Sequence, residues 1–186
     1  MMTHRHITDN CDFRKFIETN LHEYSSLQIN LPRSIATGII HWGQDYIDND
    51  SIYKNDNNFG REKEIHVTVL YGIHSQLPDE SIKLLTKQLP FEVHLGEISL
   101  FTNNEEFDVV KITVSSPKLI KLNKLLKVNL KNTQTFPDYN PHVTIAYVKK
   151  GRCSNLAGRK DFNDIKWTVN TLIFSSRTGD KTPIRF

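Results

Sequence analysis

Two nearly identical stretches, "HVTVLY" at residues 66–71 and "HVTIAY" at 142–147, decide how this chain of 186 residues is interpreted. They agree at the histidine, the first valine, the threonine and the tyrosine. Chance alone gives about 0.65 His-x-Thr triplets in a chain of this composition, so a single copy carries little information. We attribute the "HIT" at 6–8, which no strand pattern follows, to chance. The matched pair opens two apolar strands and needs another explanation.

The sequence around these stretches repeats in the same order. An alternating strand at 26–31 is followed by Pro32 and a helical pattern, and a strand at 107–115 is followed by Pro117 and another helical pattern. In each copy a loop then leads into the HVT strand, and the longer, Asn-rich loop at 48–64 accounts for the difference in length between the copies. We therefore predict an α+β domain made of two similar lobes, each with one HVT strand at its centre.

Outside the repeat, the periodicity predicts one more helix and further strands, at 78–89, 91–101 (bent at Gly96), 165–176 and 182–186. We expect two antiparallel sheets that face a central cleft, with the helices outside. Residues 1–24 are predicted to form an N-terminal extension that contains a helix, and residues 25–186 to form one bilobal domain.

The composition limits the class of protein. The net charge is +3 and the pI is near 8.8, which suits a phosphate-bearing ligand but not a polybasic protein that binds duplex DNA. No stretch approaches the roughly 18 apolar residues of a membrane span, and the first residues show no secretion signal. Cys11 and Cys153 have neither metal nor redox spacing. We expect a cytoplasmic protein with no membrane and no duplex DNA as partner.

The two HVT strands also carry a chemical pattern, formed by a tetrad of His66, Thr68, His142 and Thr144. Residues two apart on a strand share a face, so each histidine points the same way as its threonine. If the lobes face each other, one neutral imidazole can accept a proton from an attacking oxygen while the other, protonated, donates one to a leaving oxygen. The threonine hydroxyls can donate hydrogen bonds to a phosphate. The tetrad therefore predicts a phosphodiesterase site, and it leaves open which histidine is the base.

Two other interpretations of the histidines fit the sequence less well. A lone strand histidine is usually an ordinary surface or core residue, but a matched pair argues against that. A zinc site needs three or four His, Cys or carboxylate ligands, and threonine is not one of them. The "HRH" at 4–6 has zinc-like spacing but no further ligand in view. We expect no metal and no other cofactor.

Two HxT motifs in a duplicated α+β chain resemble the 2H phosphoesterase superfamily, which includes the 2′-5′ RNA ligase-like phosphodiesterases. The resemblance covers roughly residues 24–176 and implies that the tetrad is catalytic. The stretches at 60–72 and 136–151 are similar to a phage-encoded branch that includes anti-CBASS proteins, which destroy the cyclic di- and trinucleotide signals of bacterial immunity. The implied activity is metal-independent cleavage of a 3′-5′ bond by a ribose 2′-hydroxyl, with a 2′,3′-cyclic phosphate as product. For a phage-encoded protein the implied location is the host cytoplasm.

Substrate-binding residues are expected at the mouth of the cleft. Phe59, Arg61 and Tyr139 lie in the loops that lead into the HVT strands, where an aromatic ring beside a cation can hold a base and a phosphate. Lys150 follows the second motif and can add positive potential, although a charged run after a strand is more often solvated surface.

The tyrosines that end the matching stretches, Tyr71 and Tyr147, are candidate stacking platforms for a base. Strict alternation along a strand, however, places each tyrosine on the face away from its histidine. We therefore predict that both pack beneath the sheet.

The expected substrate is a cyclic oligonucleotide or another short RNA-like phosphodiester. One alternative is an enzyme that opens 2′,3′-cyclic phosphates at RNA ends or acts on a 2′-5′ linkage. A second alternative is a non-catalytic sponge that binds cyclic nucleotides without turnover, although binding alone would not need both histidines. The sequence leaves the oligomeric state open.

Overall fold

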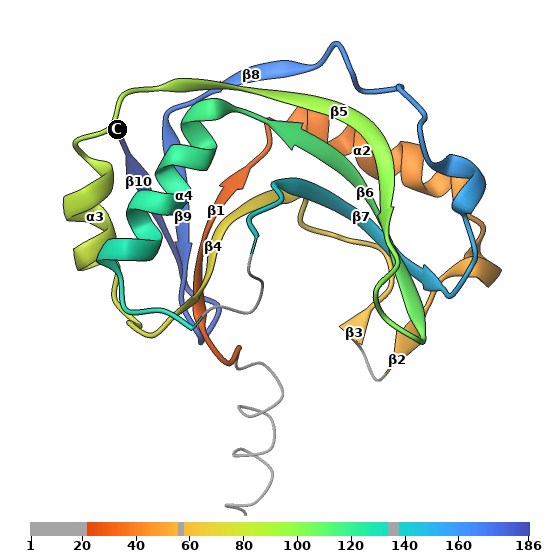
Figure 1. Cartoon of the computed structure of the whole chain (residues 1–186), viewed down its shortest axis with the longest axis horizontal. Coiled ribbons are helices and arrows are strands. Elements are labelled where there is room, and N and C mark those ends of the chain that lie inside the picture. The colour runs from red at the N-terminus through yellow and green to blue at the C-terminus, as the bar shows by residue number, and fades with distance from the viewer. Residues whose placement is uncertain (1–21, 56–57, 134–137) are drawn as a thin grey trace, which may run out of the picture.

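The fold is an arch built on one strongly curled antiparallel sheet (Figure 1). The structure, a computed structural model, describes residues 22–55, 58–133 and 138–186. The N-terminal helix predicted from the sequence, around residues 12–21, lies outside these ranges. None of the helices in the described ranges is long and apolar enough to cross a membrane.

The repeat predicted from the sequence is present as two copies of a strand, a helix and an HVT strand. The first copy consists of β1 (Ser25–Asn30), α2 (Arg33–Tyr46) and β4 (His66–Ile73). The second consists of β6 (Phe107–Ser115), α4 (Pro117–Asn129) and β7 (His142–Lys149). The other elements are η1 (Asn49–Ser51), β2 (Lys54–Asn55), β3 (Asn58–Phe59), α3 (Asp79–Leu85), β5 (Phe91–Phe101), η2 (Ser154–Leu156), β8 (Lys166–Val169), β9 (Thr171–Ser175) and β10 (Lys181–Arg185).

In the strand order, the two copies of the repeat lie symmetrically about the centre of the sheet. The order runs β10-β9-β1-β4-β7-β6-β5-β8, so β4 and β7 are central neighbours and each is followed outward by the first strand of its own copy. The α+β fold with duplicated halves is thus confirmed. The two expected sheets are the halves of one continuous sheet, joined where Val67 of β4 pairs with Val143 of β7.

Prolines and a serine cap mark the starts of the two helices of the repeat, α2 and α4. Pro32 occupies the N-cap position of α2 and cannot continue a preceding strand ladder. Ser116 caps α4 by accepting a hydrogen bond from the backbone N–H of Leu119, and Pro117 stands at the first helical position, where its missing N–H costs nothing.

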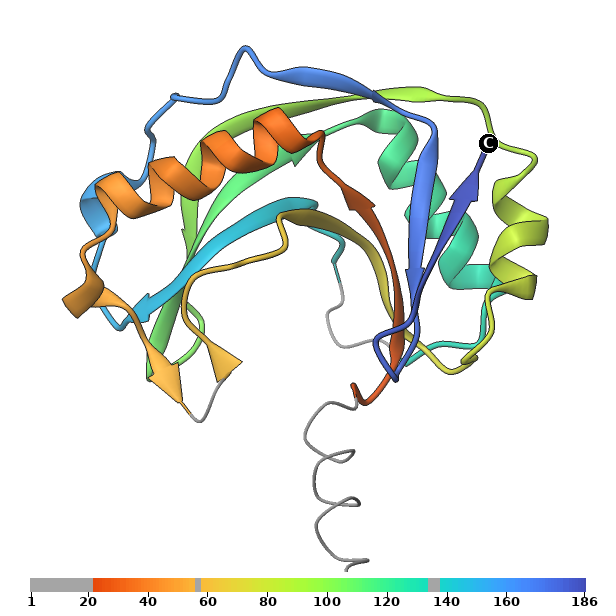
Figure 2. The same ribbon diagram turned by 180° about the vertical axis from the view of Figure 1, so that it is seen from behind.

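The two helices of the repeat, α2 and α4, each pack against the HVT strand of the other copy. A Cβ atom on Gly43 of α2 would lie 2.8 Å from Cγ2 of Ile145 in β7, so only glycine allows this close approach. Helix α4 packs against β4 in the corresponding way. The two helices therefore lie on opposite sides of the molecule: α4 is nearer the viewer in Figure 1, and α2 is nearer after the 180° turn in Figure 2.

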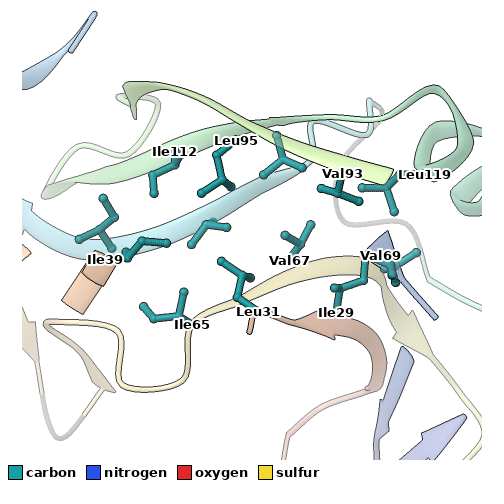
Figure 3. Close-up of a cluster of buried hydrophobic side chains, with 14 of the residues drawn as sticks. Ile29, Leu31, Ile39, Ile65, Val67, Val69, Val93, Leu95, Ile112 and Leu119 are labelled. Carbon is teal, nitrogen blue, oxygen red and sulfur yellow. The ribbon is translucent and has the colours of Figure 1, made fainter. Parts of the chain in front are cut away.

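The hydrophobic core lies between the sheet and these helices (Figure 3). Val67 and Val69 of β4 are fully buried there, together with Ile39 of α2 and Leu119 of α4. Burying one such side chain contributes about 1.5–3 kcal/mol to folding. Because the apolar residues of β4 and β7 face the helices, the residues that alternate with them face the inner, concave side of the arch.

Candidate active site

The tetrad is brought together by the pairing of the two central strands. In antiparallel register, the Val67–Val143 pair places His66 opposite Thr144 and Thr68 opposite His142. Both valines are completely buried on the helix side, whereas the four tetrad residues are half-buried on the concave side. Two imidazoles and two hydroxyls thus form one compact group related by the approximate two-fold axis of the sheet.

Both imidazole rings are held in the same way. Nδ1 of His66 lies 2.6 Å from the carbonyl oxygen of Glu64, and Nδ1 of His142 lies 2.7 Å from that of Asn140. A carbonyl oxygen only accepts hydrogen bonds, so Nδ1 is the protonated nitrogen in each neutral ring. Nε2 of each ring is therefore the atom that accepts or delivers a proton.

The two histidines differ in their surroundings. Burial lowers the pKa of His142 below its ordinary value, and the charges of Lys111 and His66 lower the pKa further, while the hydrogen bond to Asn140 opposes them. Lys111 lies on β6 directly opposite Thr144. The rings of Phe101 and His142 also form a T-shaped contact, with centroids 4.8 Å apart. His142 consequently favours the neutral form that a general base requires.

A β-bulge follows each HxT triplet and overturns the prediction for the tyrosines. The register of β4 against β1 skips Val69, and the register of β7 against β6 skips Ile145. One extra residue reverses the alternation of side chains beyond it. Tyr71, which is 40% exposed, and Tyr147 therefore lie on the same face as the tetrad, and the prediction that they pack beneath the sheet is wrong.

At each bulge, the carbonyl oxygen of the extra residue accepts a hydrogen bond from the opposite copy of the repeat. The carbonyl oxygen of Val69 accepts a hydrogen bond from Nδ2 of Asn123, 2.7 Å away, and that of Ile145 accepts one from the N–H of Glu62, 2.8 Å away. The hydroxyl of Tyr139 donates to the carbonyl of Thr68 at 3.0 Å. Burial raises the pKa of this hydroxyl, so it remains a donor. Tyr139 therefore supports the strand beneath the tetrad.

Aromatic rings flank the tetrad on both lobes. On one side the ring centroid of Phe59 is 5.0 Å from those of Tyr147 and Phe107. On the other, Tyr71 lies against Tyr24, with centroids 6.0 Å apart. Phe59 is 43% exposed and has a φ of 66°, which a non-glycine residue adopts at a cost of about 1–3 kcal/mol; such strained residues are enriched at functional sites.

Arg61 and Lys150, the two cationic side chains predicted to bind the substrate, contact other groups of the protein. The guanidinium of Arg61 donates to the carbonyl oxygens of Gly43 and Ile47, at the C-terminal end of α2. Nζ of Lys150 forms an ion pair with Asp108, with the nitrogen 3.0 Å from Oδ1. These contacts give both side chains a structural role, and we do not carry them into the proposed binding site.

Lys111 and Asn123 were not predicted from the sequence as residues of the site. The only signal for Lys111 was a lysine between the valines and the isoleucine in the middle of the strand "FDVVKITVS". Asn123 looked like one polar residue on an amphipathic helix, although it is buried.

A sequence model described as the 2′-5′ RNA ligase superfamily matches residues 47–181. The chain belongs to the 2′-5′ RNA ligase superfamily. Members of this superfamily are 2H phosphoesterases, so membership indicates phosphodiesterase activity at the level of the family. No curated protein matches the chain.

Solved structures of other proteins share the fold of this chain. E. coli LigT in its apo form is 20% identical, with a TM-score of 0.58 over 88% of this chain and 94% of that one. E. coli LigT complexed with phosphate is 21% identical, with a TM-score of 0.56 over 88% and 93%. The protein TT0787 of Thermus thermophilus is 13% identical, with a TM-score of 0.55 over 87% and 98%. At these identities the likeness shows the shared fold.

Proposed function

We propose that the protein is a metal-independent phosphodiesterase that cleaves 3′-5′ bonds of cyclic di- and trinucleotide immune signals, as a phage counter-defence against CBASS. The observation that carries the proposal is the crossed arrangement of the tetrad, in which each imidazole lies opposite the threonine of the other strand. With Nδ1 of both rings bonded to a backbone carbonyl, two Nε2 atoms are available to act on opposite sides of one phosphorus atom.

In the first step a ribose 2′-oxygen attacks the adjacent phosphorus. Its proton passes to the neutral Nε2 of one histidine as the new P–O bond forms. The P–O5′ bond breaks, and O5′ takes a proton from Nε2 of the other, protonated histidine. The product is a linear chain that ends in a 2′,3′-cyclic phosphate. Water can open this ring with the roles of the two histidines exchanged.

The threonine hydroxyls act on the phosphate rather than on the protons. Each donates a hydrogen bond to a non-bridging oxygen, whose negative charge grows as five oxygens surround phosphorus. Loss of one such donor from a preorganised site typically costs about 10²–10³ in turnover.

A nucleotide substrate is supported by the aromatic rings on both sides of the tetrad. Exposed aromatic faces bind bases by stacking with little dependence on base identity. Tyr71 and Phe59 present such faces on the two lobes, so a base on each side of the cleaved phosphate has a partner. Structures of E. coli LigT are known in complex with 3′-AMP, NADP+ and ATP, so this fold accommodates nucleotides in that protein. The cyclic substrate and the counter-defence role rest on the sequence resemblance alone.

Turnover separates this proposal from its alternatives. The protein is incubated in EDTA with an excess of cyclic di- and trinucleotides, 2′-5′ oligomers and RNA with 2′,3′-cyclic ends, and products are resolved by chromatography. We expect many turnovers on a cyclic nucleotide, with a 2′,3′-cyclic phosphate appearing first. Activity confined to RNA ends or 2′-5′ bonds would favour the RNA-processing alternative. Product no greater than the enzyme concentration would favour the sponge, and inactivation by EDTA would contradict the metal-free mechanism.

A further inference from the structure

Lys111 is a buried lysine beside the tetrad. Its residue is only 7% exposed, and because it pairs with Thr144 across β6 and β7 its side chain lies on the concave side. Nζ donates to Oγ of Ser99 at 2.7 Å and lies 4.3 Å from the centroid of Phe101, the ring that contacts His142. The ammonium is thus within the same group of side chains as the catalytic pair.

Within the described residues this ammonium has no carboxylate at ion-pair distance. Among the ion pairs of that part of the chain none involves Lys111, and its side-chain hydrogen bond goes to a neutral hydroxyl. Desolvation accordingly lowers its pKa, an effect that Glu97, further away, only partly opposes. A buried cation without a counter-ion is costly, and lysines are rarely buried unless paired.

Two comparisons within the molecule show that the fold does not require this charge. Lys150, a lysine with a structural role beside β6, forms an ion pair with the buried Asp108, whereas Lys111 forms none among the described residues. The position equivalent to Lys111 in the first copy of the repeat is Gln28, which pairs with Thr68 and is neutral. The sheet therefore accommodates an uncharged side chain at the equivalent position of the first copy, and of the two positions only the one beside Thr144 carries a charge.

We propose that the ammonium of Lys111 is a catalytic anion-binding group that contacts a non-bridging oxygen of the phosphodiester held by the tetrad. This inference rests on the proposed function. The phosphate supplies the missing counter-charge when substrate binds, and its charge rises from one to two as the attacking oxygen bonds to phosphorus. Lys111 therefore stabilises the transition state more than the bound substrate. Because the equivalent residue on the other lobe is neutral, the positive charge is concentrated on the His142 side of the phosphorus.

The variant Lys111→Met tests this inference, because methionine fills similar space without the charge. Lys124→Met, at an exposed position on α4, is the matched control for the change in net charge. Inorganic phosphate is titrated into each protein, and binding is followed by the NMR signals of the His66 and His142 side chains. Thermal unfolding of each variant and turnover on the best substrate from the panel are measured in parallel.

We expect Lys111→Met to weaken phosphate binding about tenfold or more, as for loss of a charge-assisted hydrogen bond, and to lower turnover about 10²–10³-fold. We expect its Tm to be unchanged or higher, because a buried charge has been removed. The inference would be overturned if Lys111→Met bound phosphate as tightly as the wild type. It would also be overturned if phosphate did not shift the histidine signals of the wild-type protein. A lowered Tm with unchanged turnover would show a structural lysine instead. Loss of phosphate binding in Lys111→Met together with an inactive wild type would refute only the proposed function.

Discussion

Asn123, on α4 of the second copy, donates a hydrogen bond to the backbone carbonyl of Val69 in the first copy, over 2.7 Å. Val69 is the bulged residue immediately after Thr68, so this bond fixes the point at which β4 changes the direction of its side chains. One buried amide thus couples a helix of one lobe to the HVT strand of the other.

Replacing this amide should destabilise the protein and disturb the tetrad. Asn123→Leu leaves the carbonyl of Val69 without its partner in a buried place, which costs about 1–3 kcal/mol. We expect urea unfolding to show this decrease in unfolding free energy. Turnover should fall as well. Asn129→Leu, whose amide bonds the carbonyl of Leu125 on the exposed side of the same helix, is the control and should lose much less. Equal losses in both variants would contradict the role of the bulge.

Removing either imidazole should abolish cleavage without unfolding the protein. His66→Ala and His142→Ala each leave one side of the phosphorus without a proton-transfer group, which typically costs about 10²–10⁴ in rate. Both residues are only half-buried, so circular dichroism and Tm should change little. His41→Ala, on an exposed face of α2, should retain full activity. Full activity in either tetrad variant would remove that residue from the mechanism.

The pKa of His142 should lie below its ordinary value. Its pKa is lowered by burial, by Lys111 on β6 and by His66 on β4, so in NMR titrations the ring should stay neutral below its ordinary value of 6.5. In Lys111→Met the pKa should rise toward that value. As the pH falls below about 6.5, the unfolded chain binds a proton at this residue that the folded protein does not. Folding stability should therefore decline from pH 6.5 down to the folded pKa, and a titration at or above 6.5 would contradict this.

Phe59 should contribute to binding and not to stability. Phe59→Asn removes the ring, but asparagine tolerates positive φ, so relief of backbone strain offsets the lost ring contacts. Stacking on a base is worth about 1–3 kcal/mol, so KM should rise about fivefold or more while Tm changes little. Leu77→Asn removes another exposed apolar side chain and should leave KM unchanged. An unaltered KM in Phe59→Asn would exclude the stacking role.

Arg61 should behave as a structural residue. Arg61→Met leaves the carbonyls of Gly43 and Ile47 without their donor, so we expect a loss of about 1–3 kcal/mol in unfolding free energy and an unchanged KM. Arg33→Met, at the exposed start of the same helix, should change neither quantity. A raised KM with full stability would return Arg61 to the substrate site.

Local patterns were sufficient for the elements of the fold. The expected strands at 91–101 and 107–115 coincide with β5 and β6, and the bend expected at Gly96 is a register shift between Leu95 and Ile98. Prolines predict where α2 and α4 begin, since proline lacks the N–H that a strand ladder needs. The loop at 48–64 was less well predicted, because it contains the short hairpin of β2 and β3.

The sequence by itself determined that the domain is duplicated and that each copy carries a histidine and a threonine on one strand face, because period-two alternation is a local property. Only the tertiary structure decided that β4 and β7 pair through Val67 and Val143, so that the two half-sites cross. It also decided the faces of Tyr71 and Tyr147. A bulge exists only relative to a partner strand, so the reversal that it causes cannot be read from one strand alone.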